Sequence, residues 1–154
     1  MNDERLSIRH AAPADLPGLL ALYQHLTPDD APPSPEVATG ILNRFLRYPG
    51  SAIFLAQADA TLVGSCVLVV IPNLTRGGQP YGLVENVVTH GDYRRRGIGR
   101  QLLDAATDAA WSEGCYKLML LTGMSDAGTL AFYEKAGFAQ SKTGFQKRRI
   151  ATRG

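Results

Sequence analysis

The residues best suited to chemistry lie in a basic, glycine-containing turn, Arg94-Arg95-Arg96-Gly97-Ile98-Gly99. An apolar, strand-like run (residues 83–89) precedes the turn, and an amphipathic helical pattern begins at Gly99. A strand that enters a helix through such a turn leaves backbone N–H groups unpaired at the positive end of the helix dipole. Glycine lets a phosphate approach these groups, and arginine adds charge-assisted contacts to its oxygens. The turn therefore predicts a binding site for a phosphorylated ligand.

Two other phosphate motifs do not fit this turn. No lysine follows the pattern G-x-x-x-x-G-K-[ST], and the stretch from Gly97 lacks the third glycine of the dinucleotide fingerprint. Taken alone, the turn is also compatible with a solvated basic loop before an ordinary helix.

A second segment, residues 129–138, has the pattern of a short helix that ends at Gly137 and follows an apolar strand. Together the two segments resemble the GNAT superfamily of acyl-CoA-dependent N-acetyltransferases. The pyrophosphate turn of that family has the pattern R/Q-x-x-G-x-G/A, which Arg94 to Gly99 match. Its later helix carries F-Y-x-x-x-G-F, which Phe132 to Phe138 match, and the resemblance extends from Leu6 to about Ile150.

The resemblance implies that acetyl-CoA is the co-substrate, held by the turn and by the strand before it. Backbone amides of that strand would polarise the acetyl carbonyl and pair with the pantetheine arm. Many family members have an asparagine that contacts this arm, but Asp126 stands there in this chain and is equally suited to cap the next helix. The expected cofactor-binding residues are Val87, Val88, Thr89, Arg94, Arg95, Arg96, Gly97, Ile98, Gly99, Arg100 and Tyr133.

Two side chains are the candidates for proton transfer. A phenol with a pKa of about 10 is suited to protonate a departing thiolate, and the resemblance places Tyr133 beside the thioester sulfur. Glu85 interrupts an apolar strand, so we expect it to face a cleft, where it takes a proton from the amine or only contacts the substrate. In a regular strand Asn86 points to the opposite face and has a structural role, unless a bulge intervenes. His90, at the end of the strand, is expected to be a turn residue.

The hydrophobic pattern predicts an α/β (α+β) fold in a single domain, residues 1–154. The resemblance implies a mixed, largely antiparallel central sheet with a splayed strand pair and helices on both faces. We expect Asp15 to cap the first helix. The expected helices are residues 15–26, 35–47, 99–112 and 127–136, and the expected strands are residues 6–9, 52–58, 61–71, 82–90, 117–122 and 140–150.

Composition narrows the classes of partner. A net charge of +2 is too small to indicate nucleic acid, and the longest apolar run (residues 66–72) is too short to cross a membrane. Two cysteines without C-x-x-C spacing favour a reducing cytoplasm, and no cluster has metal-ligand spacing. Residues 145–150, in the last strand, could pair across a two-fold axis, which predicts a homodimer.

We therefore expect an acetyl-CoA-dependent N-acetyltransferase acting on a primary amine of a small molecule, which enters between loops 28–35 and 75–80. Residues 85–88 and 114–117 resemble the glucosamine-phosphate N-acetyltransferase branch, but Leu120, Leu121 and Thr122 replace the polar residues used there. Protein N-termini and lysines remain possible acceptors. The alternative from another class is a non-catalytic acyl-CoA-binding or sensing module, and a basic nucleic-acid binder ranks third.

Overall fold

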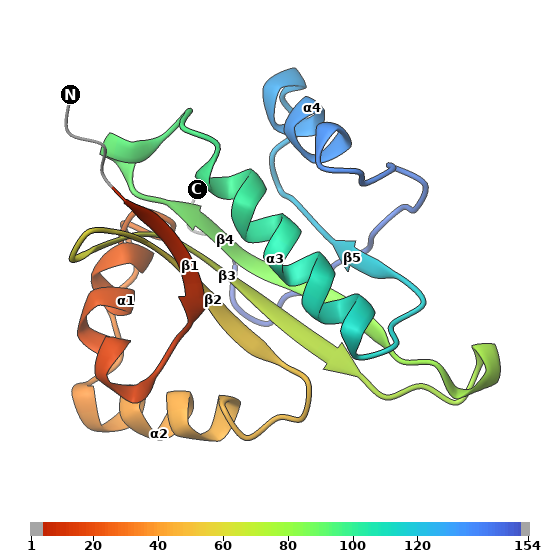
Figure 1. Ribbon diagram of the computed structural model, residues 1–154, viewed down its shortest axis with the longest axis horizontal. Helices are drawn as coiled ribbons and strands as arrows, with labels where there is room; N and C mark the ends of the chain where they lie inside the picture. Colours follow the sequence, from red (N-terminus) through yellow and green to blue (C-terminus); the bar gives the residue numbers. More distant parts are fainter. Residues whose placement is uncertain (1–4, 152–154) are drawn as a thin grey trace. The chain divides into compact units, whose positions relative to one another are not determined.

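The computed structural model describes residues 5–151, and the chain divides into two compact units, Met1–Leu120 and Leu121–Gly154. The described part of the second unit contains the helix α4 (Ala127–Lys135). In chain order, the first unit contains β1 (Leu6–His10), α1 (Leu16–Tyr23), α2 (Pro35–Phe45), β2 (Ala52–Ala58), β3 (Thr61–Ile71), β4 (Tyr81–Thr89), α3 (Ile98–Ser112) and β5 (Leu118–Leu120), as Figure 1 shows.

The sheet of the first unit has the strand order β1-β2-β3-β4-β5 (Figure 1). Neighbouring strands from β1 to β4 are antiparallel, whereas β5 is parallel to β4. The parallel pair needs a crossover connection, and α3 supplies it. The predicted mixed, largely antiparallel sheet is confirmed.

Helices cover both faces of this sheet, as predicted. On one face α3 lies so close to β3 that a Cβ atom on Gly64 would come within 2.8 Å of Ile98, which explains the glycine in the strand. On the other face α1 and α2 pack against alternate strand residues, because successive side chains point to opposite faces. That second core contains Leu19, Leu42, Ile53, Leu55 and Val67.

Two helix predictions need correction. The apolar spacing in residues 35–47 predicts Val37, Ile41 and Leu42 on the inner face of α2. Leu42 is buried there, together with Ala38, but the side chains of Val37 and Ile41 are 55% and 57% exposed. Asp15 stands at the N-cap of α1 but its side chain does not cap that helix. It forms two 2.7 Å hydrogen bonds with Arg9 and accepts the Ala12 N–H at 2.8 Å, because the 3-10 turn Pro13–Asp15 precedes α1.

The predicted last strand, residues 140–150, is wrong for this structure. No strand occurs among residues 121–151, so the segment has no ladder partner within its own unit. The side chain of Phe145 is 96% exposed. The strand predicted at residues 117–122 is also shorter, three residues in β5.

Candidate active site

The basic turn joins β4 to the N-terminus of α3. His90 accepts the Asp92 N–H at Nδ1 over 3.1 Å and so begins the short 3-10 turn Gly91–Tyr93, which agrees with its expected role as a turn residue. Gly97 then takes a left-handed conformation (φ +77°) directly before the first residue of α3. Glycine adopts this conformation without the strain that a Cβ atom causes.

The N-terminus of α3 has no side-chain cap. The first helical bond runs from the Gln101 N–H to the Gly97 C=O, at 3.1 Å, and the N-cap residue has no side chain to offer. The N–H groups of Ile98, Gly99 and Arg100 therefore have no acceptor within the helix, at its positive end. An uncapped helix N-terminus can bind an anion, and phosphate binding at this turn stays a prediction.

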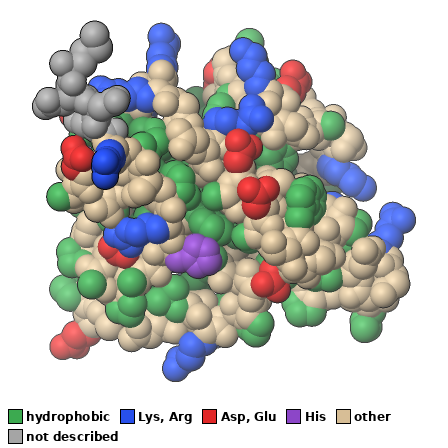
Figure 2. Space-filling view, in the orientation of Figure 1, with side chains coloured by type: hydrophobic (Ala, Val, Ile, Leu, Met, Phe, Trp, Pro, Cys, Tyr) green, Lys and Arg blue, Asp and Glu red, His purple; other side chains and the backbone are tan. Residues whose placement is uncertain are grey.

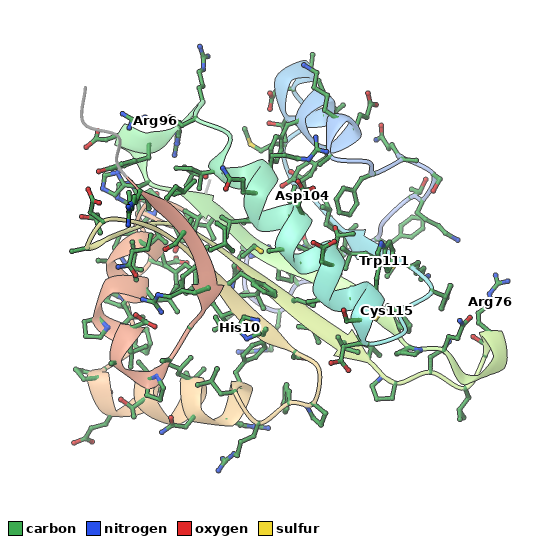
Figure 3. All side chains as sticks on the ribbon, in the orientation of Figure 1. His10, Arg76, Arg96, Asp104, Trp111 and Cys115 are labelled. Carbon is green, nitrogen blue, oxygen red and sulfur yellow. The ribbon has the colours of Figure 1, made fainter. Side chains whose placement is uncertain are left out.

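The arginines of the turn are exposed and differ in their contacts. Arg96 lies 4.8 Å from the ring centre of Tyr93 and donates to the Asp92 C=O at 3.2 Å, at the side of the molecule where α3 begins (Figure 3). Arg100 bonds Asp104 one helical turn later, at 3.0 Å. Arg94 and Arg95 are exposed and form no hydrogen bond or ion pair with the described residues, so both can turn toward an anion.

The strand β4 separates from β5 before it reaches the turn. Pairing covers Gly82 to Val84 on β4, which lie opposite Leu118 to Leu120 on β5. On its other side, β4 continues to pair with β3 as far as Thr89, opposite Gly64. Ladder bonds alternate, and the His90 N–H donates to the Val63 C=O, so we expect the Thr89 N–H to point away from β3. The predicted strand edge at Val87, Val88 and Thr89 thus has no β5 partner.

A bulge in β4 places Asn86 differently from a regular strand. The pairing shifts between Val67, opposite Glu85, and Ser65, opposite Val88, so that Asn86 and Val87 face a single β3 residue. Asn86 takes a positive φ of +49°, which asparagine tolerates better than most residues. Glu85 is exposed immediately before the bulge.

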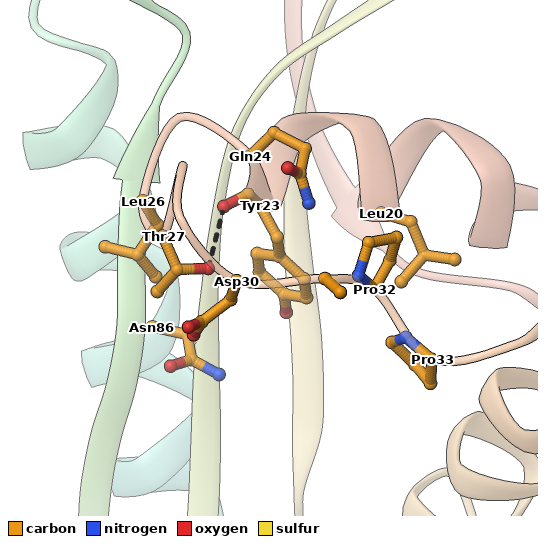
Figure 4. Close-up of a pocket in the computed structure, with 10 residues that line it drawn as sticks. Leu20, Tyr23, Gln24, Leu26, Thr27, Asp30, Pro32, Pro33 and Asn86 are labelled. Atoms are coloured by element: carbon orange, nitrogen blue, oxygen red, sulfur yellow. Dashed lines mark hydrogen bonds between the residues drawn. The ribbon is translucent and has the colours of Figure 1, made fainter. Parts of the chain in front are cut away.

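Beside this bulge lies a pocket of about 220 Å³ (Figure 4). The end of α1, the proline-rich loop after it and Asn86 form its walls. The loop that contains Arg76 does not line it, because that loop joins the opposite ends of β3 and β4 (Figure 3). The pocket is thus bordered by one of the two loops expected to surround the acceptor.

Tyr23 is a site residue that the sequence analysis missed. Burial raises the pKa of Tyr23, while the nearby side chains of Ser65 and Asn86 act in the opposite direction. The Ser65 hydroxyl is fully buried, yet it meets hydrogen-bond geometry with none of the described residues. In the sequence, Ser65 interrupts an otherwise apolar strand, and this was the available signal that polar groups gather here.

Tyr133 belongs to the second unit, where it lies between two aromatic rings. Its ring centre is 5.0 Å from that of Phe132 and 6.3 Å from that of Phe138. Burial raises the pKa of Tyr133, so its phenol keeps its proton at neutral pH. At the start of α4, Asp126 accepts the Thr129 N–H at 2.9 Å, which lowers the pKa of Asp126 and confirms its N-cap position.

Two further features bear on ligands. Residues 5–151 contain no group of three or more His, Cys, Asp or Glu side chains placed to hold a metal ion. None of the helices in that range has the length and apolar character needed to span a membrane. Basic and acidic side chains are interspersed on the face shown in Figure 2.

Comparison with known proteins assigns this architecture to a family. The model of the Acetyltransferase (GNAT) family matches residues 19–138, which include the splayed strand, the basic turn and α4. The chain therefore belongs to the GNAT acetyltransferase family, whose members use acetyl-CoA.

Individual relatives agree with this assignment. The chain is 36% identical over 135 residues to a glucosamine 6-phosphate N-acetyltransferase of Trypanosoma brucei brucei, covering 86% of this chain and 88% of that protein. It is 46% identical to the structure of a putative acetyltransferase from Agrobacterium tumefaciens, with a TM-score of 0.88 over 93% of this chain and 99% of that one. The fold is also shared, at 19% identity and a TM-score of 0.78, with an aminoglycoside N-acetyltransferase solved in complex with CoA, covering 95% of this chain and 96% of that one.

Proposed function

We propose that this protein transfers the acetyl group of acetyl-CoA to a primary amine of a small molecule by direct attack. The observation that carries the proposal is the course of β4, whose unpaired edge leads into the uncapped N-terminus of α3. An extended arm with a pyrophosphate at its end fits such a path, since the edge offers backbone hydrogen bonds and the turn offers N–H groups and arginines.

The residues present fit acetyl-CoA. A Cβ atom on Gly97 would meet no described atom within 4 Å, so the outer side of the turn has room for a phosphate. Ile98, Gly99 and Arg100 would bind it through backbone N–H groups, and Arg94 to Arg96 through their side chains. Bound acetyl-CoA supplies the thioester carbonyl that the amine attacks and the sulfur that leaves.

Glu85 and Tyr133 then move the two protons. The exposed carboxylate of Glu85 accepts a proton from the amine, directly or through one water, because only a neutral amine has a lone pair for attack. The Tyr133 phenol donates its proton to the departing thiolate. These roles require the two units to act as one acetyltransferase domain, residues 1–154, which is part of the proposal.

A thiol-release assay tests this function. Purified protein and acetyl-CoA are incubated with amino sugars, amino acids, polyamines, aminoglycosides and peptides, and free CoA is measured. We expect turnover with at least one small primary amine. Acetyl-CoA binding without turnover across the panel would favour a non-catalytic acyl-CoA-binding module, and activity confined to a folded protein would contradict the small-molecule acceptor.

We further propose that the protein forms a homodimer in the cytoplasm. Residues 140–150 form no strand and expose Phe145 almost fully, so a second copy of the chain could cover this segment. Cys66 and Cys115 are buried free thiols, which suits a reducing compartment.

A further inference from the structure

The pocket beside Asn86 has walls of distinct chemistry. Leu20, Pro32 and Pro33 form apolar surface, and Asp30 contributes a carboxylate (Figure 4). None of the described residues that line the pocket is Lys, Arg or His. The only formal charge on its walls is therefore negative.

Polar groups accompany this carboxylate at the bulge of β4. The Tyr23 ring and the Asn86 amide line the pocket, and Ser65 beside Tyr23 is fully buried and does not line it. A pocket of about 220 Å³ has room for several waters or for a small amine.

We propose that this pocket holds the acceptor, and that the acceptor is a cationic or uncharged amine with a compact apolar part rather than a phosphorylated amine. The inference rests on the proposed function and names its substrate class. Asp30 attracts an ammonium group and the prolines cover its carbon atoms, whereas a phosphate would lie against a carboxylate with no cation on the walls to balance it. The proposed acceptor differs from the glucosamine 6-phosphate named for a relative that is 36% identical to this chain.

The test uses pairs of amines that differ only in a phosphate: tyramine and its phosphate ester, and glucosamine and glucosamine 6-phosphate. Thiol release gives kcat/KM for each. We expect the phosphate to lower kcat/KM at least tenfold in both pairs. A phosphorylated amine that matches or exceeds its partner overturns the inference while leaving the acetyltransferase function intact. If no amine is turned over, the proposed function fails and the inference fails with it.

Charge changes at Asp30 give a second readout. Asp30→Asn should raise KM for tyramine about tenfold. Asp30→Lys should favour the phosphate ester: the kcat/KM for tyramine phosphate divided by that for tyramine should rise at least tenfold. Asp30 is exposed and its N–H bonds the Thr27 C=O, so both variants keep the backbone contact and should fold. The matched control is Glu36→Gln, an exposed carboxylate at the start of α2 that does not line the pocket. Equal effects of the Asp30 and Glu36 changes would overturn the inference, since long-range charge alone would then explain them.

Discussion

Val84 is the last residue of β4 that pairs with β5, and its partner is Leu120. Beyond this pair, β4 continues through residues 85–89 along β3, with a bulge at Asn86 and the basic turn at its end. The separation and the bulge occur within a few residues of each other. The same strand therefore has an edge that β5 does not pair and also places the bulged residue Asn86 at a pocket.

Gly97→Val should weaken acetyl-CoA binding. The new side chain would occupy the space that the proposal gives to the pyrophosphate, and valine strains at a φ of +77°. We expect calorimetry to show that the binding free energy of acetyl-CoA weakens by at least about 1.4 kcal/mol, which is a tenfold rise in Kd. Gly78→Val is the matched control, since Gly78 also has a positive φ (+83°) and open space around it. Both variants should lose about 1–2 kcal/mol of stability from backbone strain, so strain alone cannot make their Kd values differ. Equal Kd values of the two variants for acetyl-CoA would contradict the assignment of the turn.

Tyr133→Phe should lower kcat about 10²–10⁴-fold and change Kd for acetyl-CoA little, because the hydroxyl acts on charge that forms as the thiolate leaves. Burial raises the pKa of Tyr133, so kcat of the wild type should fall with rising pH only above about pH 10, and this fall should be missing in the variant. Tyr48→Phe, at an exposed tyrosine, controls for the loss of a phenol. A wild-type rate in Tyr133→Phe would assign the ring to packing against Phe132.

Glu85→Gln should lower kcat/KM for the amine about 10–100-fold at pH 7, because the variant has no carboxylate to take the proton. Raising the pH toward the pKa of the amine increases the neutral fraction, so the deficit should shrink. A deficit that stays constant with pH would indicate that Glu85 only contacts the substrate. Far-ultraviolet circular dichroism of both proteins excludes a folding defect.

The Arg9–Asp15 pair should make stability depend on acid pH. The hydrogen bonds from Arg9 hold the pKa of Asp15 below its ordinary value of 3.8, so the ionised form is the one that folding favours. The ionised Asp15 adds its full contribution to the free energy of unfolding above the pKa that it has in the unfolded chain. This contribution is lost as the pH falls through the lower pKa that Asp15 has in the folded protein. The side chains are 39% and 14% exposed, so screening limits the contribution to about 1 kcal/mol. Urea unfolding of wild type and Asp15→Asn should differ at pH 7, and the difference should shrink as the pH falls below 3.8; a difference that does not shrink in acid would contradict the pairing.

A dimer should be detectable by sedimentation, with twice the mass of the chain. If residues 140–150 form the interface, Phe145→Asp should shift the protein toward monomer, because it places a charge in an apolar contact. Leu74→Asp is the control, since Leu74 is also almost fully exposed but lies in the first unit. A wild-type monomer would refute the proposal.

The sequence predicted features that local chemistry controls. The uncapped helix N-terminus after the basic turn and the Asp126 cap each depend on neighbouring residues, and both are present. The bulge at Asn86 was not predicted, because it depends on the pairing with β3, which is distant in sequence. The pocket was missed for the same reason: Tyr23 and Asn86 meet only after α1 packs on the sheet. Periodicity likewise gave α2 a helical repeat but not which of its sides is buried.

The burial of both cysteines has a practical consequence for the measurement of thiol release. Burial raises the pKa of the Cys66 thiol to about 12 and also raises the pKa of Cys115, so neither forms the reactive thiolate readily in the folded state. A colorimetric thiol reagent added to native protein should therefore count CoA released by turnover and little else. Denaturation exposes both sulfurs, so the same reagent, used without substrate, reports the fraction of unfolded molecules.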